Sequence, residues 1–130
     1  MTDTTLVASA QAVTDTAADV GSAIVDGVSR AEHANIIVNL DRGASENVRI
    51  QLLGGNNYGD WTYVKATNVV PGATIATSNR QTYYEIDADE DQVIAFPYDL
   101  YKRWDRIKVQ AWAGTVGATA ATVTVYCKLG

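Results

Sequence analysis

Several residue types are scarce in this chain, and each shortage excludes a class of protein. Its 130 residues include one cysteine, one histidine, one methionine, one phenylalanine and two prolines. With Cys127 as the single cysteine, no internal disulfide can form, and folding in a reducing cytoplasm is expected. No apolar run reaches the ~18 residues of a membrane-spanning helix, and residues 1–6 lack the charged and apolar regions of a secretory signal.

Positive charge is also scarce. Ten Lys and Arg residues face fifteen Asp and Glu residues, which gives a formal net charge of −5. Binding of nucleic-acid phosphates requires clustered basic side chains, and so does adsorption to an anionic membrane. We therefore expect neither nucleic acid nor membrane as a partner. A hydrophobic content of 47% supports a packed core, and the length fits one domain over residues 1–130.

What the sequence has in abundance is alternation of apolar and polar residues, which is typical of half-buried strands. In residues 47–52, for example, Val48, Ile50 and Leu52 alternate with polar side chains. The same period predicts strands at 35–40, 106–111 and 122–128, and weaker patterns predict strands at 5–13, 22–28, 60–66, 83–87 and 92–96. About eight or nine short strands predict an all-β antiparallel sandwich, jelly-roll-like or immunoglobulin-like, or else a small barrel.

Some segments leave alternatives open. Residues 15–25 could instead begin a helix, although Gly21 weakens that reading. Residues 54–57, which begin Gly54-Gly55, are interpreted as a turn. Two similar strand pairs, 35–40 with 48–52 and 106–111 with 123–127, predict two hairpins that face each other. Residues 1–13 are a candidate extended arm that could add a strand to a neighbouring subunit.

Residues suited to catalysis or metal binding are few. His33 could pair with Cys127 as a nucleophile, but nothing local supports that site, and no phosphate-binding glycine motif is present. We expect no enzyme activity and no cofactor. Asp87, Asp89 and Asp91 begin like a calcium loop, but an EF-hand requires Gly and Glu where Gln92 and Tyr98 stand. A looser calcium site or a solvated acidic turn are the remaining interpretations.

Aromatic side chains with polar atoms are the stronger candidates for a binding surface. They favour sugar platforms and protein interfaces, because one part of the ring system is apolar and another forms hydrogen bonds. Tyr58, Trp61 and Trp112 are predicted to contact a partner. The alternative for Trp61, and equally for Trp104, is that the indole covers the core at a strand end.

The segment 55–64, the pair 103–112 and 121–126, and the Ala/Thr-rich start 4–26 together resemble small β-sandwich virion proteins of tailed bacteriophages. That resemblance implies a capsid decoration (cement) protein or a head or tail auxiliary protein, made in the host cytoplasm and located in the virion. Its partners would be a major capsid or tail protein and further copies of itself, as in a trimer. The alternative function is a carbohydrate-binding β-sandwich module of the fibre or adhesion type.

Overall fold

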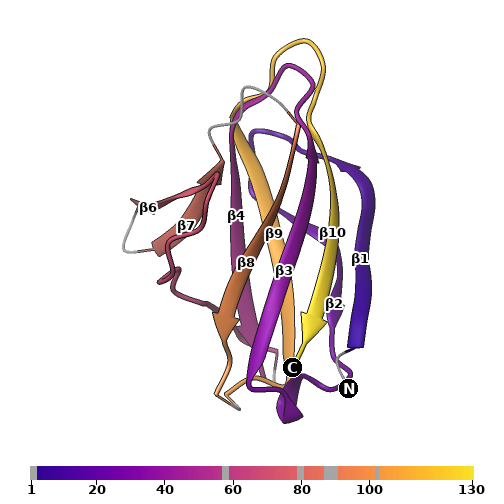
Figure 1. Cartoon of the computed structure of the whole chain (residues 1–130), viewed down its shortest axis with the longest axis vertical. Coiled ribbons are helices and arrows are strands. Elements are labelled where there is room, and N and C mark those ends of the chain that lie inside the picture. The colour runs from indigo at the N-terminus through magenta and orange to yellow at the C-terminus, as the bar shows by residue number, and fades with distance from the viewer. Residues whose placement is uncertain (1–2, 57–58, 79–80, 87–90, 102) are drawn as a thin grey trace.

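Two antiparallel β-sheets packed face to face form the molecule (Figure 1). The computed structural model describes residues 3–56, 59–78, 81–86, 91–101 and 103–130. Within these ranges the only helical segment is a short 3-10 turn, η1 (Val28–Arg30). The all-β sandwich predicted from the alternation is therefore confirmed.

The strand order is that of a jelly roll, in which two Greek keys wind across both sheets. Sheet A has the order β1 (Asp3–Ala12), β10 (Thr122–Leu129), β3 (His33–Asp41), β8 (Gln92–Asp99). Sheet B has the order β2 (Ala18–Ile24), β9 (Arg106–Thr115), β4 (Glu46–Gly55), β7 (Gln81–Ile86), β6 (Thr74–Ser78), and β5 (Trp61–Tyr63) pairs with β4. Both termini lie at the same end of the sandwich (Figure 1).

The core lies between the sheets and is built from the alternating positions predicted from the sequence. Every second residue is buried along β3, β10 and residues 106–113 of β9, whereas in β4 all residues from 50 to 55 are buried. Aromatic rings fill the centre, where the Tyr84 ring lies 4.6 Å from the Phe96 ring and 6.0 Å from the Tyr98 ring. The Tyr84 hydroxyl donates a hydrogen bond to the Asn68 carbonyl at 2.8 Å, so this buried polar atom is satisfied.

The helix considered for residues 15–25 is wrong, because this segment contains strand β2. Val20 and Ile24 reach the core from β2. Gly21 between them has φ +66°, and a Cβ there would overlap the carbonyl of Val7 in β1. Glycine is therefore needed for the close approach of the two strands and does not interrupt a helix.

The two predicted hairpins are also wrong, although their strands are present. β3 and β10 pair with each other in sheet A, and β4 and β9 pair with each other in sheet B. The connections β3–β4 and β9–β10 therefore cross from one sheet to the other, and they lie together at the end opposite the termini (Figure 1). In each predicted hairpin, one strand therefore belongs to sheet A and the other to sheet B. The two strands face each other across the core, and each points its apolar side chains into it.

Residues 3–12 of the predicted arm form β1, the outer strand of sheet A, paired with β10 of the same chain. Ala8 and Val13 are buried, and the Val13 amide donates a hydrogen bond to the Ala121 carbonyl at 2.8 Å. Exchange of this strand with a neighbouring subunit stays a prediction.

The sequence did not indicate β6. All five of its residues are exposed or half-buried, so no buried face imposes an alternation on the sequence.

Candidate binding surfaces

The outer face of sheet A carries an uncharged surface across all four strands. Leu6 is paired with Tyr126, Tyr126 with Ile37, and Ile37 with Ala95, so one row of side chains crosses the sheet. Leu6 is 54% exposed and Tyr126 is 37% exposed. Removing such apolar surface from water lowers the free energy, so this surface favours contact with a partner. We call this surface the sheet A face; its residues are Leu6, Asn35, Ile37, Asn39, Val93, Ala95, Pro97, Thr124 and Tyr126.

Charged side chains flank the sheet A face at its two ends. Asp41 follows at the end of β3, while His33, Asp99 and Lys128 lie at the end near the termini. Val93, within the face, is 69% exposed. An uncharged centre with a charged margin is the usual anatomy of a protein–protein interface, since charges are depleted from interface cores.

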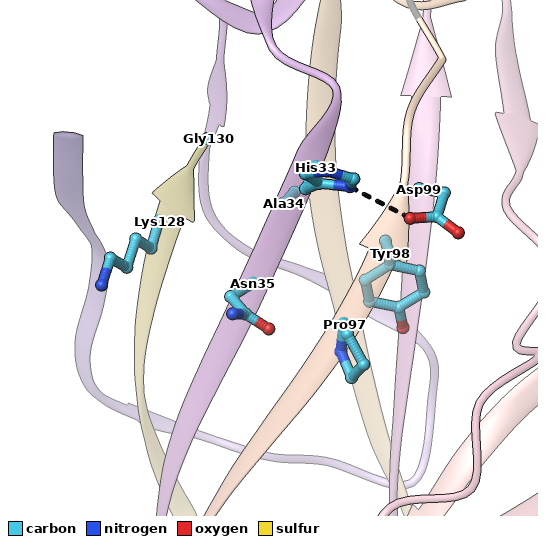
Figure 2. A pocket seen from close by; sticks show the side chains of 8 residues that line it. All are labelled: His33, Ala34, Asn35, Pro97, Tyr98, Asp99, Lys128 and Gly130. Carbon is cyan, nitrogen blue, oxygen red and sulfur yellow. Dashed lines mark hydrogen bonds and ion pairs between the residues drawn. The ribbon is translucent and has the colours of Figure 1, made fainter. Parts of the chain in front are cut away.

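A pocket of about 300 Å³ lies at the His33 end of this face (Figure 2). His33 and Asp99 are paired residues of β3 and β8, and the His33 Nδ1 lies 3.1 Å from the Asp99 Oδ1. The two side chains are 62% and 47% exposed, so their attraction is screened by solvent. The described residues that line the pocket are His33, Ala34, Asn35, Pro97, Tyr98, Asp99, Lys128 and Gly130, with no serine, threonine or cysteine among them.

The catalytic pair considered from the sequence is not formed. Cys127 points into the core from β10, whereas His33 lies on the outer side of β3. Burial raises the pKa of the Cys127 thiol to about 12, which keeps it protonated near neutral pH. Burial also raises the pKa of the Tyr98 phenol beside the pocket, with a smaller contribution from Tyr84. Both side chains are buried in the core.

The outer face of sheet B carries a different surface, which begins at Trp61 on β5. The Arg106 Cζ lies 4.3 Å and the Lys108 Nζ lies 4.4 Å from the Trp61 ring centroid. Both are cation–π contacts, which stabilise partly buried sites by about 1 kcal/mol each. The Arg106 Nε is buried and has no hydrogen-bond partner among the described residues. A Cβ at residue 55 would come within 3.0 Å of Trp61, so Gly55 lets the indole lie against the strand.

Gly54, the neighbouring residue of β4, leaves room for a side chain on the opposite side of the sheet. A Cβ there would overlap the Trp104 indole, which packs against the core. The turn predicted at Gly54-Gly55 is therefore wrong: both glycines belong to β4 and make room for one indole on each side of the sheet. Trp104 covers the core, as one of the two interpretations held, while Trp61 lies on the outer face.

Trp112 lies toward the other end of the outer face of sheet B. Its ring is 5.0 Å from the ring of Tyr83 on β7, in an edge-to-face arrangement. The Arg49 Cζ lies 5.8 Å from the Tyr83 centroid, and the Arg49 Nε donates to the Glu85 Oε2 at 2.8 Å. These contacts join three strands, and they hold the two rings in a fixed relation.

Between the two tryptophans lies a pair of amides. Gln51 on β4 is opposite Gln110 on β9. The Gln51 Nε2 donates to the Thr82 carbonyl at 2.8 Å, and the Gln110 Nε2 donates to the Asp19 Oδ1 at 3.1 Å. Asp19 also pairs with Lys108, whose Nζ lies 3.3 Å from the Asp19 Oδ1. We call this surface the sheet B strip; its residues are Asp19, Arg49, Gln51, Trp61, Tyr83, Glu85, Arg106, Lys108, Gln110 and Trp112.

The structure places two of the three predicted partner residues on one face. Trp61 and Trp112 both belong to the sheet B strip, at opposite ends of it, and Tyr58 lies outside the described residues. Sequence reasoning assigned no role to Tyr83. The signal was the doublet Tyr83-Tyr84, because alternation within a strand places one ring outside and the other in the core.

The calcium candidates cannot be assembled from the described residues. Asp87 and Asp89 lie outside them, and the Asp91 Oδ1 accepts a hydrogen bond from the Arg42 amide at 3.0 Å. Nowhere in the described ranges do three His, Cys, Asp or Glu side chains gather to hold a metal ion.

Comparison with family models, with curated proteins and with solved structures gives no match for this chain. No helix among its described residues is long and apolar enough to cross a membrane.

Proposed function

We propose that this chain is a non-enzymatic structural protein that assembles with copies of itself and with other subunits of a virus particle. The observation that carries the proposal is the sheet A face. Its row of Leu6, Tyr126, Ile37 and Ala95 crosses four hydrogen-bonded strands without a charge, in a protein of net charge −5, and all but the half-buried Ile37 are exposed. Two such faces can meet without burying unpaired charges, which would otherwise cost several kcal/mol.

Two analogies support a virus particle as the place where this protein acts. The sequence resembles small virion proteins of tailed bacteriophages, and the jelly-roll strand order is one that viral capsid domains share with lectins and other folds. Because one fold can serve many functions, these analogies support only the location in a virus particle. Assembly with other subunits is supported by the sheet A face. The partners proposed are a major capsid or tail protein and a homo-oligomer of this chain, located in the virion.

A charge placed in the middle of the sheet A face tests the proposal. Tyr126→Glu adds a carboxylate at an exposed position of β10, where folding tolerates it but burial against a partner does not. Sedimentation velocity should show the unmodified protein as an oligomer and Tyr126→Glu as a monomer, with unchanged circular dichroism.

The matched control is Trp112→Ala, which removes an aromatic ring from the opposite outer face. It should leave the oligomer intact. If Tyr126→Glu sediments like the unmodified protein, the sheet A face is not the assembly surface.

A further inference from the structure

The sheet B strip carries indoles, amides and ion pairs that assembly through the sheet A face does not use. Its two tryptophans are separated along the strands by pairing register. Gly55 of β4 is opposite both Trp61 and Arg106, and Arg49 of β4 is opposite Trp112. Six residues therefore separate the two ends, which is about 20 Å at the usual rise of a strand. A ligand that touches both indoles must be long and extended.

The middle of the strip offers hydrogen-bonding groups at fixed positions. Gln51 is 2% exposed and bonded to the Thr82 carbonyl, so it lies beneath the surface, and the groups open to a ligand are the half-buried Gln110 and the exposed Asp19. The Asp19 side chain is 51% exposed and keeps Gln110 and Lys108 in place. Ordered amides and carboxylates bind hydroxyl groups without a large entropic cost.

Two of the three cations of the strip are neutralised by carboxylates. Arg49 is paired with Glu85, and Lys108 is paired with Asp19. Arg106, stacked on Trp61, has no carboxylate partner among the described residues and can donate to neutral oxygens. The net charge of −5 repels polyanions, since like charges raise the free energy of association.

We propose that the sheet B strip binds a neutral linear polysaccharide. The apolar C–H faces of its sugars stack on Trp61 at one end and on Trp112 at the other. Its hydroxyl groups bind Gln110 and Asp19 between the two stacking sites. This site goes beyond the proposed assembly function and lies on the opposite outer face of the sandwich, so the two activities can be lost separately.

Isothermal titration calorimetry with neutral oligosaccharides tests the site. The probes are cellohexaose, mannohexaose, xylohexaose and maltohexaose, each beside its disaccharide. At least one hexasaccharide should bind, and its disaccharide should bind about tenfold more weakly or worse, because it cannot reach both tryptophans. Trp61→Ala and Trp112→Ala should each weaken the hexasaccharide about tenfold.

Tyr101→Ala is the matched control, since it removes an aromatic ring that is 66% exposed and belongs to neither surface. It should leave hexasaccharide affinity unchanged. The proposal is overturned if no hexasaccharide binds, if binding survives both tryptophan substitutions, or if only polyanions such as alginate bind. None of these outcomes bears on whether Tyr126→Glu dissociates an oligomer, so the failure of either proposal is recognised separately.

Discussion

At the scale of the residue, Gly54 and Gly55 of β4 position two of the three tryptophans. One makes room for Trp104 on the core side, and the other makes room for Trp61 on the outer side. The sequence shows the two glycines but not their purpose, because the same dipeptide is also a common turn signal. Only the position of the facing indoles distinguishes the two, and those come from segments that are distant or unpatterned in the sequence.

Gly54→Ala should therefore destabilise the fold. The added methyl group would overlap the Trp104 ring and must push it from its place, a type of overpacking that costs about 1–3 kcal/mol. Urea unfolding followed by circular dichroism measures the change. Gly114→Ala is the control, because its nearest atom would be the Asn47 Cβ at 3.3 Å and its φ is not positive. Equal unfolding midpoints for the two variants would count against the account of Gly54.

Cys127 provides a second test at this scale, through pH. Its thiol has a pKa of about 12 in the folded protein, against an ordinary value of 9.0, because it is buried. Between these values the unfolded chain releases a proton that the folded chain keeps, so stability falls as pH rises from about 9 to about 12. In Cys127→Ala this contribution is absent. Urea midpoints of the two proteins across that pH range should diverge in slope, and parallel profiles would contradict the burial of the thiol.

At the scale of the element, alternation predicted where strands lie but not how they pair. Residues 35–40 and 48–52 show the same pattern whether they form a hairpin or cross between sheets, because each buries one face in either case. The loops that connect the strands decide between a hairpin and a crossing from one sheet to the other. Gly43 has φ +57° and Gly117 has φ +74°, and a Cβ at either residue would come within 2.7 Å of a carbonyl oxygen in the other loop. The two loops are thus packed on each other.

Ser45 joins these two loops from a fully buried position. Its Oγ donates to the Val116 carbonyl at 3.0 Å and accepts from the Ala121 amide at 2.8 Å. Ser45→Ala leaves both groups unsatisfied, and we expect a loss of about 2–4 kcal/mol in the free energy of unfolding.

The control for Ser45 is Thr124→Val. The Thr124 Oγ1 accepts an exposed hydrogen bond from the Ala10 amide at 3.0 Å, and water can replace it. This variant should lose less than about 1 kcal/mol. Chemical denaturation of both variants measures the difference. A Ser45→Ala protein as stable as Thr124→Val would show that the loop contact does not hold the crossing strands.

At the scale of the whole molecule, the two outer faces of the sandwich differ in chemistry. The sheet A face is uncharged and apolar at its centre, while the sheet B strip combines indoles, amides and ion pairs. The sequence predicted that Trp112 faces outward and left Trp61 open between a partner contact and a cover of the core, but it could not place Leu6, Ile37, Ala95 and Tyr126 in one row. That row depends on the register of four strands that come from four separate parts of the chain.

The native mass of the unmodified protein in solution tests assembly most directly. Light scattering coupled to size exclusion, at increasing protein concentration, should give a defined multiple of the 13.9 kDa chain mass, the same with calcium and with a chelator. The sheet A face then removes its apolar row from water in the oligomer. A mass of one chain at every concentration would contradict the proposal that this protein assembles with copies of itself.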